Sequence, residues 1–211
     1  MKADLRREMK ARRAGRDPVV SAADSVAAQD RLCAMPVFVR ARHVACYLAA
    51  PGEVATDRIL QACFEAGKKV AVPARRGGPA DYGLCRFAPG TPLRVGALGI
   101  SEPAEPDWVD AGEMDLIVVP GVAFDAAGRR LGHGWGCYDR LLAGAARAFK
   151  AGLAFEWQIV SAVPVDGHDV LLDAVVTGRM IYGADAGAGI SSARASVENT
   201  NTTTKGEGCK I

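Results

Sequence analysis

The spacing of apolar and polar residues predicts that helices and strands alternate along most of the chain. A helix is expected at 2–14, and a second at 21–35 with Ser21 as its N-cap. A third begins after Thr56, where the apolar side chains fall on one face. A fourth is expected at 138–148, directly after a glycine-rich segment. Each of these helices therefore has one apolar face that must pack against another layer.

Consecutive apolar residues predict strands between these helices, and the stretch 75–110 is typical of loops and edge strands. The strands are expected at 43–49, 69–74, 114–120, 151–155 and 175–182. The run at 114–120 is apolar on both faces, as in a central parallel strand. This alternation predicts an α/β domain with a mostly parallel central sheet flanked by helices, a Rossmann-like open sheet.

The composition changes after Gly183. Residues 184–211 are mostly Gly, Ala, Ser, Thr and Asn, with few large apolar side chains. Such a segment cannot bury enough surface to offset the entropy of ordering it. We therefore expect one domain over 1–183 and a disordered tail over 184–211.

Composition places the chain among globular proteins, because 49% of its residues are hydrophobic and 24% are charged. No apolar run approaches the ~18 residues of a membrane span, so no membrane association is expected. The first residues lack the apolar core of a signal peptide, and Asp4 and Glu8 argue against a transit peptide. The six cysteines form no C-x-x-C pair, which favours reduced thiols. A cytoplasmic location is expected.

Positive charge is concentrated at the start of the chain. Seven basic residues lie among the first sixteen, while the rest of the chain is slightly acidic. A nucleic-acid binder more often spreads its positive charge over its body, so we expect a small anion as partner and no nucleic acid. Lys2, Arg6, Lys10 and Arg13 recur at helical spacing. This stripe is either a solvated face or a surface that places Lys2 and Arg6 on a polyphosphate.

The segment 119–140, VPGVAFDAAGRRLGHGWGCYDR, carries the strongest chemical signal. Its glycines at 132, 134 and 136 alternate just before a predicted helix, where backbone N–H groups can approach an oxyanion closely. Arg129 and Arg130 are candidate phosphate partners, and Asp139 is placed where a carboxylate can hold Mg²⁺ against phosphates. The segment is neither a Walker A loop nor a dinucleotide fingerprint. By itself it also fits a plain strand–helix connection.

Other candidates are weaker. Glu53 follows a strand at the end where open α/β sheets bind ligands, although most such glutamates are only solvated. Trp135, within the glycine-rich segment, could stack on a flat ring. Asp166 and Asp169 fit either a metal ligand and its neighbour or an ordinary turn. Cys137 has no assignable base, so a catalytic thiol is not expected.

In combination these segments resemble the 5-formyltetrahydrofolate cyclo-ligase family, also called 5,10-methenyltetrahydrofolate synthetase, over about residues 2–183. The segment 119–140 is similar to the family pattern V-P-G, then F-D, then R-L-G-x-G-x-G-Y-Y-D-R, with Cys137 in place of the first tyrosine. The opening K-x-x-L-R at Lys2, the strand and turn before Glu53, and V-P-V-x-x-x-D ending at Asp169 follow the family's order.

The resemblance implies an ATP-dependent ligase that converts 5-formyltetrahydrofolate to 5,10-methenyltetrahydrofolate, releasing ADP and phosphate. The ATP-binding residues that it implies are Lys2, Arg6, Arg130, Leu131, Gly132, His133, Gly134, Trp135, Gly136, Cys137 and Tyr138. The folate-binding residues that it implies are Leu48, Glu53, His133, Gly134, Trp135, Gly136 and Cys137. It further implies that Asp139 and Asp169 bind Mg²⁺ and that Arg130 and Asp139 are catalytic.

The expected partners are a reduced folate and ATP, bound by a monomer. Two other classes stay open at this point. One is a non-catalytic relative that binds nucleotide or folate and has lost turnover, although Arg6, Glu53 and Asp139 are all retained. The other is an RNA-binding module that uses the basic first helix, although the chain lacks aromatic residues interleaved with that charge.

Overall fold

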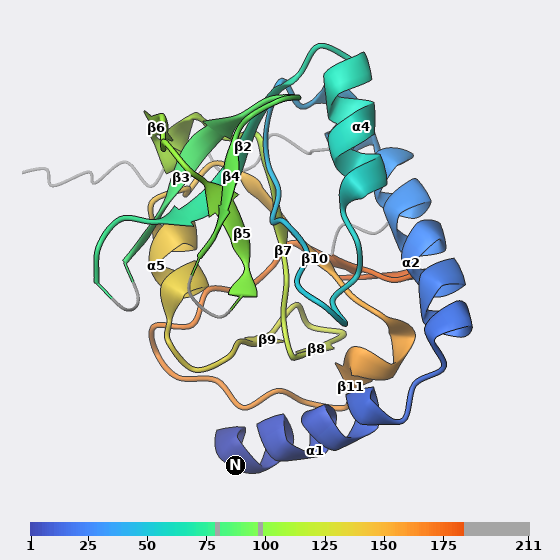
Figure 1. The fold of residues 1–211 in the computed structure, drawn as a ribbon. Helices are drawn as coiled ribbons and strands as arrows, with labels where there is room; N and C mark the ends of the chain where they lie inside the picture. The colour runs from blue at the N-terminus through green and yellow to red at the C-terminus, as the bar shows by residue number, and fades with distance from the viewer. Residues whose placement is uncertain (79–80, 97–98, 184–211) are drawn as a thin grey trace, which may run out of the picture.

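The centre of the molecule is an eight-stranded mixed sheet flanked by helices (Figure 1). The computed structural model describes residues 1–78, 81–96 and 99–183, so the predicted tail at 184–211 lies outside the described residues. The strand order is β13-β12-β10-β7-β1-β2-β3-β6. In chain order these strands are β1 (His43–Ala45), β2 (Lys69–Arg75), β3 (Tyr82–Phe87), β6 (Trp108–Val109), β7 (Leu116–Val119), β10 (Phe149–Leu153), β12 (Ala174–Val176) and β13 (Ile181–Tyr182). The predicted fold class is confirmed.

The inner strands of the sheet are parallel and the edge strands are antiparallel. The pairs β12–β10, β10–β7, β7–β1 and β1–β2 are parallel, whereas β13, β3 and β6 join antiparallel. The chain passes from β1 to β2 on one side and later returns to β7 on the other side of β1. The order therefore reverses between β1 and β7, and open α/β sheets bind ligands beside such a reversal.

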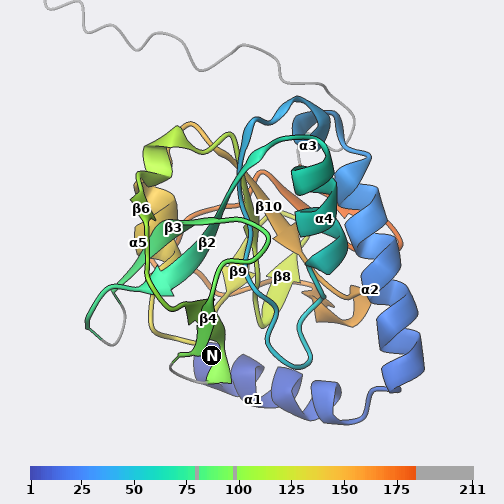
Figure 2. The ribbon, with the colours of Figure 1, turned by 45° about the horizontal axis from the view of Figure 1, so that its top comes forward.

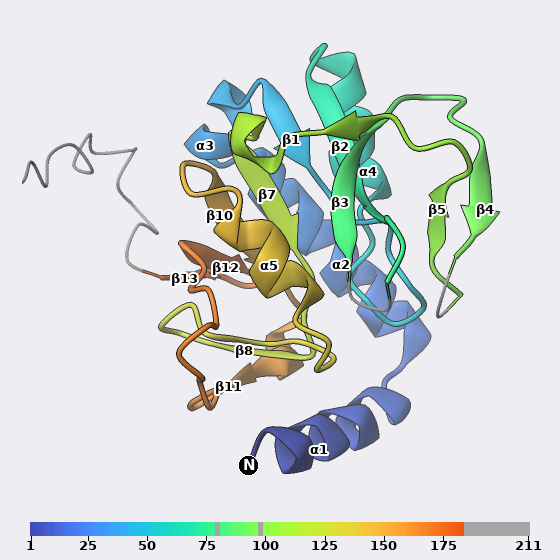
Figure 3. The ribbon, with the colours of Figure 1, turned by 90° about the vertical axis from the view of Figure 1, so that its left-hand side faces the viewer.

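Helices cover both faces of the sheet (Figure 3). Their bounds are α1 (Lys2–Ala14), α2 (Pro18–Cys33), α3 (Pro36–Arg40), α4 (Asp57–Glu65) and α5 (Cys137–Ala143). On one face, Leu32 of α2 and Ile59 of α4 pack in a single core with Val118 of β7. On the other face, Leu142 of α5 packs against Ile117. Burying each such side chain contributes roughly 1.5–3 kcal/mol, so the two cores hold the layers together.

Helix α1 lies outside these layers, across one end of the sheet (Figures 1 and 2). Its buried Met9 packs on Ala123, Leu131 and Val163 beneath a small second sheet. That sheet has the order β11-β8-β9, from β11 (Ile159–Val160), β8 (Ala123–Asp125) and β9 (Arg130–Leu131). A separate pair, β4 (Leu93–Val95) and β5 (Ser101–Pro103), stands beside β2 and β3. This packing brings α1 next to the segment that follows β9.

The boundaries of two helices and the capping of a third differ from the sequence-based predictions. Helix α2 begins at Pro18, because the Asp17 carboxylate caps it by accepting from the Val19 amide at 2.7 Å. Ser21 therefore lies inside the helix. The Thr56 hydroxyl donates to the Tyr47 carbonyl at 2.7 Å, so it anchors the preceding strand rather than capping α4. Helix α5 ends at Ala143 instead of continuing to 148.

The predicted strands are mostly shorter in the structure. Strand β1 stops at Ala45, because the chain leaves the sheet at Tyr47 and forms the wall of a cavity. The strand expected at 175–182 is two antiparallel strands, since the Thr177 amide donates to the Met180 carbonyl at 3.0 Å and turns the chain. Helix α3 and the β8–β9 hairpin were not predicted.

Candidate active site

A cavity of about 770 Å³ opens at the carboxyl ends of the parallel strands. Tyr47 and Leu48 follow β1, Arg75 ends β2, and Pro120 and Gly121 follow β7, so three adjacent strands supply one wall. Helix α1, the glycine-rich segment 132–136 and the segment 166–169 supply the others. The cavity therefore lies at the reversal in strand order between β1 and β7.

Every site residue that the family resemblance implied lines this cavity. They are Lys2, Arg6, Leu48, Glu53, Arg130, Leu131, Gly132, His133, Gly134, Trp135, Gly136, Cys137, Tyr138, Asp139 and Asp169. Arg129 is different, although it was also a candidate phosphate partner. Its Nε donates to the buried carboxylate of Asp125 at 2.6 Å. Arg129 therefore supports the β8–β9 turn and does not line the cavity.

The glycine-rich segment needs its glycines for backbone reasons. Gly134 has φ +105° and Gly136 has φ +65°, in the region that other residues rarely adopt. A Cβ on Gly134 would also lie 3.3 Å from Cζ of Arg6. Nε of Arg6 donates to the Gly132 carbonyl at 2.9 Å. Helix α1 is thus tied directly to this segment, and the guanidinium of Arg6 rests against its backbone.

Arg130 and Asp139 form a largely buried ion pair at the base of the segment. Nη2 of Arg130 lies 3.0 Å from Oδ1 of Asp139, with the two side chains 5% and 17% exposed. The guanidinium also stacks over the ring of Tyr138, 5.5 Å from its centroid. Nε of Arg130 is buried and has no hydrogen-bond partner among the described residues. A buried donor without a partner is costly. Arg130 also lines the cavity, so the remainder of its guanidinium is suited to an anionic ligand there.

Lys2 bridges two carboxylates of the segment 166–169, which also lines the cavity. Its Nζ donates to Oδ2 of Asp166 at 2.7 Å and to Oδ2 of Asp169 at 2.6 Å. Burial acts to raise the pKa of Asp169, but the hydrogen bonds from Lys2 and from the Asp166 amide outweigh burial and hold that pKa below its usual range. The sequence left a turn and a metal site as alternatives here. The structure contains the turn, because the Asp169 amide donates to the Asp166 carbonyl at 3.0 Å.

The same cluster offers donors that fit a divalent cation. Ligand atoms of Asp166, His168 and Asp169 lie within 4.8 Å of one another. Carboxylate oxygens are the ligands that Mg²⁺ prefers, and Mg²⁺ is commonly held by one or two of them together with phosphates. Asp139 lines the same cavity. The donor chemistry of these residues therefore fits Mg²⁺.

Glu53 lies on the wall next to β1. Burial raises its pKa, while Oε2 accepts from the Ala50 amide at 3.0 Å. Tyr47 and Tyr138 lie close by, and burial, followed by the charge of Glu53, raises the pKa of both phenols well above the usual value. The Tyr47 hydroxyl donates to the Val54 carbonyl at 2.7 Å, which fixes the loop that carries Glu53.

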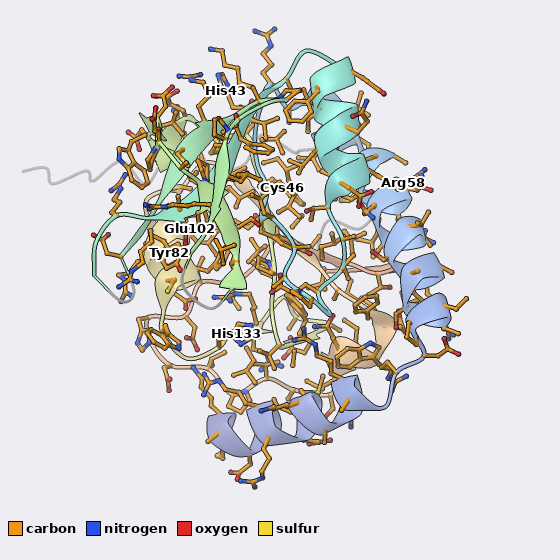
Figure 4. All side chains as sticks on the ribbon, viewed as in Figure 1. His43, Cys46, Arg58, Tyr82, Glu102 and His133 are labelled. Atoms are coloured by element: carbon orange, nitrogen blue, oxygen red, sulfur yellow. The ribbon has the colours of Figure 1, made fainter. Side chains whose placement is uncertain are left out.

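His133 and Cys137 are both uncharged at neutral pH. Burial lowers the pKa of His133, and the nearby charges of Arg13, Arg130 and Arg6 lower it further. His133 projects into the space above α1 (Figure 4). Burial raises the pKa of Cys137, so its sulfur is a thiol rather than a thiolate. A protonated thiol is a poor nucleophile, which is consistent with the prediction that Cys137 is not catalytic.

Several cavity residues were not selected from the sequence. Arg13 belongs to the basic stripe on α1, and its spacing from Arg6 could have indicated that it faces the same way. Tyr47 lies next to Leu48, but the predicted strand was expected to continue through it. Arg75 and Tyr82 come from β2 and β3, in a region that gives no chemical signal in the sequence.

A model of the 5-formyltetrahydrofolate cyclo-ligase family matches residues 1–178. The chain belongs to the 5-formyltetrahydrofolate cyclo-ligase family. This confirms the resemblance found in the sequence and, with it, the prediction of a ligase.

Other members of the cyclo-ligase family resemble this chain over most of its length. A probable 5-formyltetrahydrofolate cyclo-ligase from Caenorhabditis elegans is 35% identical over 153 residues, covering 66% of this chain and 74% of that protein. The 5-formyltetrahydrofolate cyclo-ligase of Escherichia coli K12 is 33% identical over 160 residues, covering 74% and 88%. The solved structure of Aquifex aeolicus 5,10-methenyltetrahydrofolate synthetase has a TM-score of 0.77 and 31% identity, covering 92% and 97%.

Within the described part of the chain, no helix is both long and apolar enough to span a membrane.

Proposed function

We propose that this cyclo-ligase family member converts 5-formyltetrahydrofolate and ATP to 5,10-methenyltetrahydrofolate, ADP and phosphate. The formyl oxygen attacks the γ-phosphorus of ATP, and the bond to the β-phosphate oxygen breaks to release ADP. N10 of the folate then attacks the activated formyl carbon and loses its proton to the phosphate or to solvent. The C–O bond breaks as the ring closes, and inorganic phosphate leaves with the former formyl oxygen. No protein nucleophile takes part.

Two cationic side chains support the placement of the triphosphate. Arg6 lies against the backbone of Gly132 and Gly134, and the buried Nε of Arg130 has no partner among the described residues. Phosphoryl transfer depends mainly on positioning and on neutralising charge. Arg6 would orient the phosphates along the glycine-rich segment. Arg130 would stabilise the negative charge that develops on the transferred group.

The carboxylates around Lys2 support a magnesium site. Asp139 and Asp169 would hold Mg²⁺, with Asp166 beside them, and the cation would supply charge neutralisation to the β- and γ-phosphates. Lys2 at present bridges Asp166 and Asp169. When ligands are bound, its ammonium group would donate to a phosphate oxygen and leave the carboxylates to the cation.

The wall next to β1 would hold the folate. Leu48 offers an apolar surface and Glu53 a carboxylate that can accept from the N–H groups of the pterin. Trp135 is 50% exposed on the glycine-rich segment, which lets its indole stack on a flat ring of either substrate. His133, neutral at pH 7, would contact the reacting groups without adding a second positive charge.

The observation that carries this proposal is that one cavity is lined by two different groups of residues. One is the glycine-rich segment with Arg6 and Arg130, and the other includes Leu48 and Glu53. The test is to incubate pure protein with 5-formyltetrahydrofolate and Mg-ATP and to follow the methenyl chromophore and ADP together. Equimolar formation of both is expected, with neither in excess chelator. Binding of both substrates without any chromophore would show instead a relative that has lost turnover.

We propose further that the protein acts as a cytoplasmic monomer and that residues 1–183 carry the whole activity. All five cysteines within the described residues are free thiols, which suits a reducing compartment. Light scattering on the purified protein tests the monomer. Deleting 184–211 should leave both turnover and the melting temperature unchanged.

A further inference from the structure

Arg13, in the last turn of α1, shares the lining of the cavity with Lys2 and Arg6 but differs from both. Lys2 pairs with Asp166 and Asp169, and Arg6 donates to Gly132. The guanidinium of Arg13 donates no hydrogen bond to any residue that the structure describes. A guanidinium on a cavity wall with unused donors is suited to a ligand acceptor.

The position of Arg13 is set by the loop opposite. Gly52 has φ +81°, and a Cβ there would lie 2.2 Å from Nε and 2.4 Å from Nη2 of Arg13. The guanidinium therefore packs directly on the backbone of the loop that carries Glu53. This close approach requires glycine at position 52 and holds the donors of Arg13 beside the Glu53 carboxyl.

Arg13, Glu53 and His133 all line the same cavity. The charge of Arg13 adds to the Ala50 hydrogen bond in opposing the effect of burial on the pKa of Glu53, and after burial it is the largest cause that lowers the pKa of His133. A carboxyl, a guanidinium and an imidazole from three separate segments thus meet at this end of the cavity. The phenols of the buried Tyr47 and the half-buried Tyr138 are close enough to the same carboxyl for its charge to raise their pKa values.

This group of side chains matches one end of the folate better than the other. The pyrimidine edge of a pterin presents an amino group, a ring N–H and a carbonyl oxygen in a row, which is two donors followed by an acceptor. A carboxylate beside a guanidinium complements that row, as Arg complements the equivalent oxygen of guanine. The glutamate end of the folate carries only carboxylates, which Glu53 would repel.

We propose that Arg13 is a specificity-determining residue that donates to the carbonyl oxygen of the pterin, while Glu53 accepts from its two N–H groups. The inference rests on the proposed function, because it assumes that the ligand is a folate. Arg13 would then distinguish an oxo from an amino substituent on the ring, since a donor facing an amino group leaves both without a partner.

Folic acid and aminopterin test this, because in aminopterin an amino group replaces the carbonyl oxygen and the neighbouring ring nitrogen has no hydrogen. Their dissociation constants are to be measured by calorimetry for the wild type, Arg13→Ala and Arg13→Met, which keeps an apolar stem on Gly52. Wild type should prefer folic acid. Both variants should bind folic acid about tenfold or more weakly and show a smaller preference for it, with unchanged ATP affinity; the part of the preference that remains comes from Glu53, which still accepts from the ring N–H. Arg12→Ala, on the exposed face of α1, should keep the wild-type ratio.

A preserved ratio in both variants, with unchanged melting temperatures, would overturn the proposal. The glutamate carboxylates of folic acid are the other acceptors that Arg13 could contact. Pteroic acid lacks the glutamate, so it tests this second possibility. If Arg13→Met weakens folic acid but not pteroic acid, the guanidinium binds the glutamate, and the proposal is also wrong. Turnover by the wild type is a separate measurement. A protein that shows the predicted ratios but no methenyl product would contradict the proposed reaction while leaving the assignment of Arg13 in place.

Discussion

The two ends of the cavity differ in how their charges are balanced. At the end where we propose that the phosphates bind (the phosphate end), Lys2 bridges Asp166 and Asp169, and Arg130 pairs with Asp139. At the end where we propose that the folate binds (the folate end), Glu53 is half-buried and its carboxyl accepts from a backbone amide. Helix α1 joins the two ends, and its ~1.5 Å rise per residue places Lys2 and Arg13 about 16 Å apart along its axis.

Because of this difference, each end would recognise its ligand in a different way. Lys2 and Arg130 at the phosphate end are already paired with carboxylates, whereas Arg6 contacts only a backbone carbonyl. A bound polyphosphate and its cation would exchange partners with Lys2 and the carboxylates. The folate end keeps a carboxyl partly desolvated and leaves a guanidinium unused. Its polar groups are prearranged for a ligand at some cost in stability.

The largest expected effect is at the paired end. Asp139→Ala should reduce turnover by about 10²–10³-fold, because it removes both a phosphate-end carboxylate and the partner of Arg130. It should also lower the free energy of unfolding by up to about 3 kcal/mol, since the Arg130 charge is left buried and unpaired. The measurements are the rate of methenyl formation and thermal melting.

Asp139→Asn is the matched control for folding. Its amide keeps an acceptor for Arg130 but lacks the charge that a cation requires. It should melt closer to the wild type than Asp139→Ala does and still be inactive. Substantial turnover by either variant would show that Asp139 does not serve the phosphate end.

Arg6→Ala should have the next largest effect and should act on ATP. Losing a charge-assisted contact costs about 1.5–3 kcal/mol, or about 10–150-fold in ATP affinity measured by calorimetry. Folate affinity should change much less, because Arg6 contacts the glycine-rich segment and not the wall of Glu53. Arg12→Ala is the matched control, because Arg12 pairs with Glu8 at 2.7 Å on the exposed face. Equal losses in the two variants would indicate a generic basic face.

Glu53→Gln should weaken folate binding without lowering the stability of the protein at neutral pH. Burial raises the pKa of Glu53 in the folded protein, so its favourable contribution is complete below the ordinary value of 4.5 and is lost as the pH rises through the folded pKa. At neutral pH the ionised carboxyl is a net cost. The variant should therefore be at least as stable as the wild type near pH 7.5, with this advantage shrinking toward pH 4.5.

The same substitution should raise the KM for 5-formyltetrahydrofolate by about tenfold while leaving the KM for ATP unchanged. Glu65→Gln, exposed on α4, is the control for removing a negative charge. If Glu53→Gln were less stable than the wild type at neutral pH and had an unaltered folate KM, Glu53 would not be a folate-binding group held at a cost in stability.

The smallest expected effect is at Cys137. Its thiol is protonated at neutral pH because burial raises its pKa, so Cys137→Ser should change turnover by less than about twofold. Cys137→Tyr should preserve or improve folate affinity, since it adds a ring beside the proposed folate wall. Loss of turnover in Cys137→Ser, with both substrates still bound, would require a chemical role for the sulfur.

Local sequence signals determined most elements and the chemical content of the site. Apolar spacing located α1 and α4, and the continuous apolar run located β7 at the centre of the sheet. Alternating glycines marked the segment at 132–136, because the φ values there depend on the residues themselves. These features could be predicted from the sequence because each depends only on a short stretch of the chain.

Only the tertiary structure decided how these parts combine. Lys2 meets Asp169 across 167 positions of sequence, and Arg6 meets Gly132 across 126, so neither contact has a local signal. Arg129 and Arg130 are adjacent in sequence, yet Arg129 lies in the turn before β9 and pairs with Asp125, whereas Arg130 begins β9 and lines the cavity. The burial of Glu53 and the packing of Arg13 on Gly52 likewise depend on where α1 lies. The residue types determine which chemical groups the site can contain. Which of these groups are desolvated and brought together depends on the whole fold.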